Sequence, residues 1–393
     1  MDSGFSNAIY QDQILPHVSR TFALTIPQLP AALRIPVTNA YLLCRIADTI
    51  EDEPALSPPE TLAFLQRFES AVAGRGDPQA LSLELEKRLS DRTLAAEREL
   101  VGNMQRVISV TAALNAAQRA AIHRCVELMC YGMPRFQSTA SLRGLPRLTD
   151  LDEYCYYVAG VVGDMLTDLF CDYSPAIARQ RSGLQNLAVS FAQGLQMTNI
   201  LKDVWEDRRR GACWLPQELF SRHGVDLTRL AAEPFDPGFG AGLQELVGVA
   251  HAHLRCALDY TLLIPGEERG IRRFCLWAIG LAVLTLQKIN RNPRFTAGAQ
   301  VKVSRKMVAL TRISTDAVLR SDGMLRRLFA RAARGLPLAR IGETRRPYSP
   351  RGIGAATAIE PMHAAEPQPA ETAEPATAQG AHEPRRSYGS STT

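Results

Sequence analysis

Asp48-Thr49-Ile50-Glu51-Asp52 closes an apolar run that begins at Val37, and the same spacing returns in Asp203-Val204-Trp205-Glu206-Asp207. On an α-helix the positions i, i+3 and i+4 share one face, so each segment directs three carboxylates to one side. Two such clusters that face each other repel unless cations lie between them. A single acidic turn at a helix end is usually a solvated face, and it is the repetition that favours a binding site.

Carboxylate oxygens, completed by waters and substrate phosphates, are the ligands that Mg²⁺ takes in proteins. The paired segments therefore predict two helices that hold magnesium and a diphosphate group between them. Divalent cations in such a site would act as Lewis acids and stabilise a departing diphosphate anion. The expected metal ligands are Asp48, Glu51, Asp52, Asp203, Glu206 and Asp207.

Three basic residues, Arg20, Arg45 and Lys202, stand in or near these segments. Arg45 precedes Asp48 by three residues and so shares its helix face. Guanidinium groups bind phosphate oxygens in a bidentate manner, and Lys adds a point charge. We expect the three to neutralise phosphate charge, although each taken singly is more often a surface charge or part of a salt bridge. Asn199 and Gln196 lie one and two turns before Asp203 on its face.

The chain predicts an all-α protein, because apolar residues recur at intervals of three and four and no strand alternation or hairpin signal is present. A single helical domain is expected over 19–342, after a polar lead-in at 1–18. Residues 343–393 are rich in Pro, Ala and Glu, so we expect a disordered tail. Gly132-Met133-Pro134 is expected to end one of the helices. The helices are predicted at about 36–52, 60–74, 78–90, 93–112, 115–131, 149–171, 183–207, 238–262, 267–289 and 301–334.

Composition narrows the classes of function. The net charge is +5, and no block of like charge is long enough to indicate nucleic-acid binding. A weakly basic surface is compatible with anionic substrates and with anionic lipid head groups. The eight cysteines form no Cys-x-x-Cys pair and predict buried free thiols. We see no signal peptide, and the longest apolar run, Phe274–Leu286, is too short to span a bilayer. A cytoplasmic protein without a transmembrane segment is expected, with membrane-surface contact and oligomeric state left open.

The stretch Tyr154–Gly163 combines three tyrosines with two glycines inside a predicted helix. Glycine destabilises a helix interior, so Gly160 and Gly163 indicate close approach by a ligand or by another helix. The aromatic residues fit ordinary core packing. They also fit the dry wall of a cavity for carbocation chemistry, in which a tyrosine hydroxyl accepts a proton or donates a hydrogen bond near the diphosphate.

These segments resemble the squalene/phytoene synthase family. The resemblance covers residues 17–335 and implies a single all-α isoprenoid synthase fold with a central cavity. It rests on five segments in the family's order, which are Ser19–Phe22, Arg45 with Asp48–Asp52, Tyr154–Gly163, Gln196–Asp203 with Glu206 and Asp207, and Trp214–Glu218.

The resemblance, closest to the squalene-forming members, implies a farnesyltransferase reaction. Two farnesyl diphosphates would join head to head to give presqualene diphosphate, which NADPH would reduce to squalene. Tyr154 matches the tyrosine of the first half-reaction, and Asp48, Asp52, Asp203 and Asp207 match the metal and diphosphate positions. The substrate-binding positions implied are Ser19, Arg20, Phe22, Tyr41, Arg45, Val158, Gly160, Gln196, Asn199 and Phe274.

The segment Val301–Lys306 resembles the part of the squalene-forming members that contacts the nicotinamide cofactor. Arg305 comes one residue later than in that pattern because Ser304 takes its place, so Lys302 is the firmer expectation. No Gly-x-Gly-x-x-Gly fingerprint is present, so NADPH would bind in a non-Rossmann manner. The residues alone leave NADPH use open. The alternatives are phytoene, dehydrosqualene and presqualene diphosphate synthases that do not use NADPH.

Two rival classes remain at this stage. A non-catalytic helical lipid-binding protein could share the fold, but both acidic clusters are intact. A head-to-tail prenyltransferase or a terpene cyclase typically pairs Asp-Asp-x-x-Asp with a different second motif, which this chain lacks.

Overall fold

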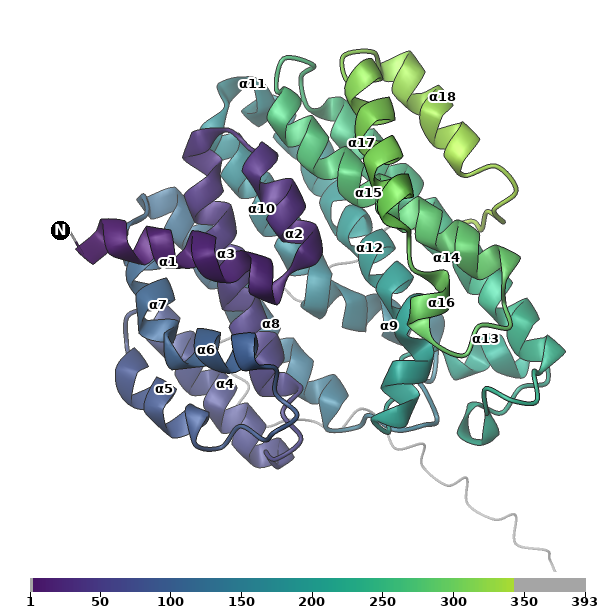
Figure 1. Cartoon of the computed structure of the whole chain (residues 1–393), viewed down its shortest axis with the longest axis horizontal. Helices are drawn as coiled ribbons and strands as arrows, with labels where there is room; N and C mark the ends of the chain where they lie inside the picture. Colours follow the sequence, from purple (N-terminus) through teal and green to yellow (C-terminus); the bar gives the residue numbers. More distant parts are fainter. Residues whose placement is uncertain (1–2, 343–393) are drawn as a thin grey trace, which may run out of the picture. The chain divides into compact units, whose positions relative to one another are not determined.

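The computed structural model describes residues 3–342, and helices dominate this region (Figure 1). No strand forms within it, although one isolated parallel bridge joins Leu145 to Pro216. The predicted all-α class is confirmed. The predicted tail at 343–393 lies outside the described residues.

The helices of the first half are α1 (Ser3–Val18), α2 (Arg20–Thr25), α3 (Ala31–Glu51), α4 (Pro58–Val72), α5 (Pro78–Glu86), α6 (Ala95–Gly102), α7 (Met104–Ala113), α8 (Ala116–Gln137), α9 (Leu148–Cys155) and α10 (Val161–Tyr173). Those of the second half are α11 (Pro175–Ala178), α12 (Arg181–Arg209), α13 (Gln217–Ser221), α14 (Pro237–Leu263), α15 (Arg269–Arg291), α16 (Gly298–Val301), α17 (Arg305–Val318) and α18 (Asp322–Ala332). A π-helix, Tyr156–Gly160, joins α9 to α10, and short 3₁₀ turns lie at Ile26–Gln28 and Leu227–Arg229.

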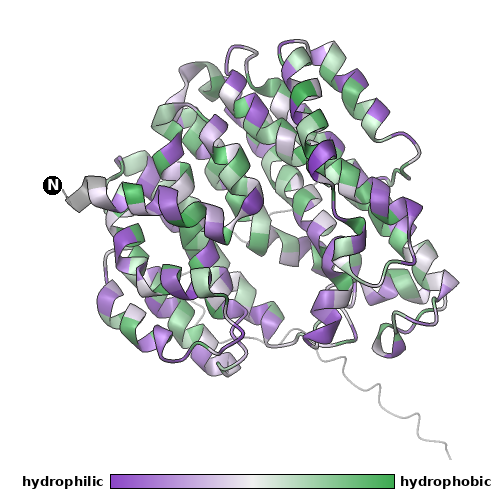
Figure 2. Ribbon diagram, in the orientation of Figure 1, coloured by the Kyte–Doolittle hydropathy of each residue, from purple (hydrophilic) through white to green (hydrophobic). Residues whose placement is uncertain are grey.

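Helix α12 runs through the middle of this arrangement (Figure 1). It packs along α14, and also against α10 and α15. Helix α3 packs against α7, α8 and α10 on the other side. Figure 2 shows hydrophobic and hydrophilic residues alternating around the long helices, the pattern of helices with one buried face. Helix α10 thus packs against both of the helices that end in the acidic clusters, α3 and α12.

Helix starts follow local sequence signals. Ser57 and Glu60 form a capping box at the start of α4, with Pro58 at its first position. Asp77 and Asp236 accept hydrogen bonds from the first backbone N–H groups of α5 and α14, each again followed by proline. Such caps satisfy backbone donors that have no partner inside the helix.

The expected helix end at Gly132-Met133-Pro134 is wrong, because α8 continues to Gln137 with Pro134 inside it. The glycine has a packing role instead. A Cβ atom on Gly132 would lie 2.0 Å from Cγ of Tyr157, so only glycine lets α8 approach that ring. Two other expected helices are divided, at Asn103 and at Lys302–Ser304 with Leu319–Ser321.

Residues expected to form a polar lead-in contribute to the core. Ser3–Val18 forms α1, which packs against α3 and α7. Tyr10, Ile14 and Leu15 are buried there. The guanidinium of Arg106 lies 4.3 Å from the Tyr10 ring centroid, a cation–π contact that ties α1 to α7.

Helix α15 carries the longest apolar run. By length and composition it is the one helix of residues 3–342 that could cross a membrane, and 72% of its most apolar window is buried inside the protein. This burial agrees with the core helix expected from the sequence. All eight cysteines are free, and all except the half-buried Cys256 are buried.

Candidate active site

The first acidic cluster lies at the end of α3, a helix buried along most of its length. Asp48 is in the last turn, Glu51 is the last residue and Asp52 is the C-cap. The Arg45 guanidinium lies 3.9 Å from Asp48 and 3.7 Å from Glu97 on α6, and donates a 3.4 Å hydrogen bond to the Tyr41 hydroxyl. Arg45 and Tyr41, both predicted, are therefore adjacent to the carboxylates.

Glu51 is the most exceptional of the three acids. It is 7% exposed, and its Oε1 atom has no hydrogen-bond partner among the described residues. Burial, followed by the charges of Asp52 and Asp48, raises the pKa of Glu51 well above its usual value. A buried carboxylate without a partner is costly. A cation held by this cluster would remove the cost.

The second cluster lies in the last two turns of α12. Lys202 Nζ lies 3.1 Å from Asp203 Oδ2, and Glu206 Oε1 accepts a 3.0 Å hydrogen bond from the Gly298 N–H at the start of α16. Burial and the neighbouring Asp203 raise the pKa of Asp207 to about 7. Burial also raises the pKa of Asp203, against the opposing charge of Lys202.

Electrostatic coupling joins the two clusters. Asp52 helps to raise the pKa of Asp207, while Arg210 at the end of α12 offsets part of the burial effect on the pKa of Asp52. Burial raises the pKa of Asp48 to about 6, with Arg45 opposing and Asp52 and Glu97 adding to the effect. Carboxylates that resist ionisation together, on two helices, fit a site for divalent cations.

No three His, Cys, Asp or Glu side chains of residues 3–342 are already gathered as a metal-chelating group. The fit to magnesium rests instead on two observations. Glu51 Oε1 is buried without a hydrogen-bond partner among the described residues, and all the predicted ligand atoms are carboxylate oxygens. When bound, Mg²⁺ would be held by the six acids predicted from the sequence.

Tyr154 lies where the two clusters meet. After burial, the charges of Glu51, Cys155, Asp52 and Asp207 raise the pKa of Tyr154 well above its usual value. Its ring stacks on Trp214 at 4.2 Å between centroids and meets Phe136 edge-on at 5.4 Å. The phenol therefore stays protonated and is suited to donate a hydrogen bond near both clusters.

The two glycines of the Tyr154–Gly163 stretch serve close packing of helices. A Cβ atom on Gly163 would lie 2.3 Å from the Ala188 carbonyl oxygen of α12, and one on Gly160 would lie 3.1 Å from a methyl group of Val189. Close approach by α12 accounts for Gly163, whereas at Gly160 the nearest atom would be Cδ2 of Tyr156, at 2.9 Å, followed by the Val189 methyl group of α12. The backbone around the half-buried Val158 is a π-helix, a form frequent at functional sites.

Aromatic side chains from four helices form a continuous wall. Phe22 on α2 lies 4.8 Å from Tyr41 on α3 and 6.5 Å from Phe274 on α15, measured between ring centroids. Phe274 in turn meets Phe170 of α10 edge-on at 6.3 Å. Three of the four were predicted as substrate-binding residues, and the structure brings them together.

The remaining predicted residues are more dispersed. Ser19 caps α2, because its Oγ accepts a hydrogen bond from the Phe22 N–H at 3.0 Å. Arg20 and Asn199 are exposed and Gln196 is half-buried. Asn199 accepts a hydrogen bond from Lys202 at 3.4 Å.

The predicted cofactor residues Lys302 and Arg305 are exposed and flank the start of α17. Ser304, the residue that displaces Arg305 from the family pattern, is the N-cap of that helix, with its Oγ accepting from the Met307 N–H. Two basic side chains beside a helix start fit the phosphates of a dinucleotide. Glu206 connects this segment to the acidic site through Gly298.

Three residues at the site were missed by sequence reasoning. Glu97 pairs with Arg45, Trp214 stacks on Tyr154, and Phe170 extends the aromatic wall. Trp214 carried a signal, since it opens a segment that contributed to the family resemblance. Glu97 and Phe170 stand in ordinary helical patterns and carried none.

Comparison with known proteins decides the family. The squalene/phytoene synthase model matches residues 15–307, about three quarters of the chain. The chain belongs to the squalene/phytoene synthase family. The resemblance inferred from the motifs is thus confirmed at this level.

Several family members are similar over most of this chain. A squalene synthase of Gibberella zeae is 30% identical over 284 residues, which are 70% of this chain and 57% of that protein. A squalene synthase of Botryococcus braunii is 31% identical over 314 residues, 76% and 62% of the two chains. The matched part of the chain thus spans only about three fifths of the length of these relatives.

Solved structures of the family share the fold. TcSQS with the ligand BPH1237 has a TM-score of 0.68 at 24% identity, over 84% of this chain and 98% of that one. A dehydrosqualene synthase in complex with a ligand has a TM-score of 0.59 at 22% identity, over 81% and 98%. The isoprenoid synthase fold expected for this family is confirmed.

Proposed function

We propose that this protein is a magnesium-dependent squalene synthase that couples two farnesyl diphosphates head to head. The observation that carries the proposal is the meeting of two acidic clusters, from α3 and α12, at the buried Tyr154 hydroxyl. The relatives named above are squalene synthases, which favours squalene over the other products of the family.

In the first half-reaction the donor C1–O bond breaks and diphosphate leaves with the electron pair. The donor C1 then bonds to the alkene of the acceptor, and loss of a proton closes the cyclopropane of presqualene diphosphate. Mg²⁺, when bound, acts as a Lewis acid toward the diphosphate. Arg45 and Lys202 add positive charge at the two clusters, and Arg20 is proposed to do so from α2.

The protonated Tyr154 hydroxyl is proposed to donate a hydrogen bond to the diphosphate and so to orient it. Phe22, Tyr41, Phe170 and Phe274 would form a dry wall for the farnesyl chains, since aromatic faces stabilise a carbocation and exclude water. Val158, Gly160, Gln196, Asn199 and Ser19 stay predictions as substrate contacts.

In the second half-reaction the C–O bond of presqualene diphosphate breaks, diphosphate leaves with the electron pair, and the resulting carbocation rearranges and is quenched by hydride. NADPH, when bound, would supply the hydride. We propose that Lys302 and Arg305 bind its phosphates, because both are basic, exposed and next to the start of α17. The hydrogen bond from Gly298 to Glu206 would keep this segment beside the diphosphate site. We further propose a cytoplasmic enzyme that contacts a membrane surface, where its hydrocarbon product would partition.

A product assay tests the proposal. The purified protein is incubated with farnesyl diphosphate and Mg²⁺, with and without NADPH, and the products are identified by mass spectrometry. We expect squalene only when NADPH is present, and presqualene diphosphate when it is omitted. Phytoene from geranylgeranyl diphosphate, or a hydrocarbon formed equally without NADPH, would contradict it.

The displaced Arg305 favours one second candidate, a presqualene diphosphate synthase. In that case the first half-reaction would proceed normally, while NADPH would leave the product unchanged. The same assay distinguishes the two, because presqualene diphosphate would then accumulate even at saturating NADPH.

A further inference from the structure

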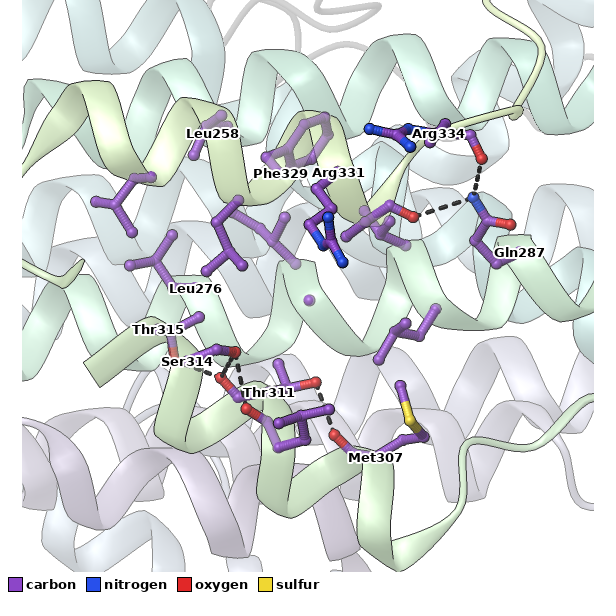
Figure 3. A pocket seen from close by; sticks show the side chains of 18 of the residues that line it. Leu258, Leu276, Gln287, Met307, Thr311, Ser314, Thr315, Phe329, Arg331 and Arg334 are labelled. Atoms are coloured by element: carbon purple, nitrogen blue, oxygen red, sulfur yellow. Dashed lines mark hydrogen bonds between the residues drawn. The ribbon is translucent and has the colours of Figure 1, made fainter. Parts of the chain in front are cut away.

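A cavity of about 470 Å³ lies between α17 and α18, over the side of α15 that carries Gly280 and Leu284 (Figure 3). The aromatic wall uses Phe274 on α15, which does not line this cavity. Its size is within the usual range for small-molecule sites. The proposed reaction makes no use of it.

Both helices that form the cavity are fixed in place. On α17, Asp316 pairs with Arg273 at 2.8 Å and the Arg312 guanidinium lies 4.6 Å from the Trp277 ring centroid. At the end of α18, the Gln287 side chain donates hydrogen bonds to the carbonyls of Ala332 and Arg334, at 3.0 and 2.8 Å. The cavity is therefore a defined groove rather than a gap left by loose packing.

The groove is largely apolar and carries basic groups from its middle to one end. Leu258 and Leu276 lie at the end where Ser314 and Thr315 also line it, Phe329 and Arg331 lie side by side near the middle, and Gln287 and Arg334 lie at the other end (Figure 3). Arg291 also lines it. In the described part of the chain, none of these three guanidinium groups has a carboxylate within 4.0 Å. This polarity matches a molecule with an apolar chain and an anionic head.

The outer surface of the same helices has a matching character. Leu310 and Ile313 on α17 are 55% and 69% exposed, and Met324 on α18 is 49% exposed. Residues 301–342 contain ten Lys and Arg against two Asp and Glu, whereas the whole chain has a net charge of +5. Exposed aliphatic residues among arginines are typical of helices that lie in the interface of an anionic membrane.

We propose that α17 and α18 dock the protein on an anionic bilayer, with the groove taking one lipid chain and Arg291, Arg331 and Arg334 binding its phosphate. The excess of basic residues in 301–342 and the apolar groove favour an anionic lipid as the partner. Exposed aliphatic residues alone would fit a protein partner equally well. The proposal rests on the membrane contact proposed above and assigns the surface and the lipid chemistry for it, and it needs no turnover to be tested.

The test is sedimentation of the full-length protein with vesicles of phosphatidylcholine, with or without a quarter of phosphatidylglycerol. We expect binding only to the anionic vesicles. The double variant R331A/R334A should bind about 25-fold more weakly, since each basic residue near such a surface contributes about a factor of five. The control R92A/R143A removes two exposed arginines elsewhere and should bind like the wild type.

A second pair of variants separates chain insertion from surface charge. L284W fills the groove without changing charge and should weaken binding at least about tenfold. L310S/I313S should also weaken it, whereas L83S/L94S, with side chains 54% and 64% exposed on α5 and before α6, should not. If L284W does not fold, the comparison of L310S/I313S with L83S/L94S tests whether apolar side chains of α17 contribute to vesicle binding.

Wild-type binding by R331A/R334A or by a folded L284W would overturn the groove as the lipid site. No sedimentation of the wild type with anionic vesicles would overturn the membrane proposal and indicate a protein partner. The product assay is run on the same samples in detergent, so a failure of the proposed reaction is recognised separately.

Discussion

The two acidic segments have the same spacing, Asp-x-x-Glu-Asp, but opposite surroundings. At the end of α3 the central glutamate, Glu51, is 7% exposed and one of its oxygens has no hydrogen-bond partner among the described residues. At the end of α12 the equivalent Glu206 is half-buried and accepts a hydrogen bond from Gly298. Glu51 thus keeps an oxygen without a protein partner, whereas Glu206 also holds the start of α16.

The difference shows what a repeated motif can predict. Spacing determines which side chains share a helix face, because the helix has a fixed period. It says nothing about which neighbour covers that face. Here the α3 segment supplies one buried acid with an unpartnered oxygen, Glu51, beside the half-buried Asp48 and the exposed Asp52. The α12 segment divides its acids between the site and the segment that leads to Lys302. The following predictions test this division.

The largest effect is expected where the two segments are coupled. Asp52→Asn and Asp207→Asn should each lower the rate of presqualene diphosphate formation by about 10³-fold. Each substitution removes one of the carboxylates proposed to bind Mg²⁺, which is the Lewis acid of the reaction. The double variant should lose little more than either single one, because both act on one site. Steady-state kinetics with varied Mg²⁺ measure this. Asp12→Asn, an exposed acid on α1, is the control, and activity near wild type in D207N would contradict the assignment.

The second effect concerns the residue between the segments. Tyr154→Phe keeps the ring that stacks on Trp214 and removes the hydroxyl alone. We expect a loss of about 10²-fold in the first half-reaction with Mg²⁺ affinity unchanged. Since burial and nearby acids keep the pKa of Tyr154 well above 10, the rate should show no inflection attributable to this phenol between neutral and mildly alkaline pH. Wild-type turnover by Y154F would show that the hydroxyl has no role.

The third prediction compares the two central glutamates directly. Glu51→Gln should lower activity by about 10²-fold. It should raise the melting temperature of the metal-free protein only at pH values where Glu51 ionises, because ionising a buried carboxyl without a partner is costly. Glu206→Gln keeps an acceptor for Gly298 and should cost less than about tenfold. Equal losses in the two variants would show that the surroundings of the two segments do not matter to the reaction.

The pH dependence of stability gives a smaller, complementary test. The folded-state pKa values of Asp48 and Asp207 are raised to about 6 and about 7 from the ordinary 3.8. Between about pH 4 and pH 7 the folded protein therefore binds more protons than the unfolded chain. Because of this difference, the unfolding free energy of the metal-free protein should fall as the pH rises over that range. Mg²⁺ should offset this fall, and should raise the melting temperature more at neutral than at acidic pH. D48N/D207N should flatten the profile, and an unfolding free energy that rises over this range would contradict the assignment.

The smallest effect is expected at the cofactor segment. Lys302→Ala should raise the KM for NADPH about tenfold, and Arg305→Ala less, with the first half-reaction unchanged in both. Product ratios of squalene to presqualene diphosphate at limiting NADPH measure this. Arg340→Ala, an exposed cation beyond α18, is the control.

The fold class and much of the candidate site were accessible from the sequence, for physical reasons. Helical periodicity and caps depend on residues close in the chain, so α3 and α12 were predicted within a few residues of their bounds. The resemblance gave Phe22, Tyr41 and Phe274 as substrate-binding positions, but their ring contacts were not predicted. Glu97 and Phe170 reach the site through packing between distant segments, which leaves no local pattern. Gly132 was misjudged because its role depends on the ring of Tyr157.

The π-helix at Tyr156–Gly160 has a consequence for redesigning this protein. It holds one residue more than an α-helical turn of that length, so it offsets the angular positions of Tyr154 and Gly163 by about 100° relative to a straight helix. Deleting one residue there would rejoin α9 and α10 into a regular helix and leave the tyrosine facing the acids and the glycine facing α12, whereas an α-helix with the same number of residues would turn one of them away. A single deletion in this segment should therefore be tolerated better than one in α9 or α10, and a helical wheel drawn across it without allowing for the extra residue assigns its faces wrongly.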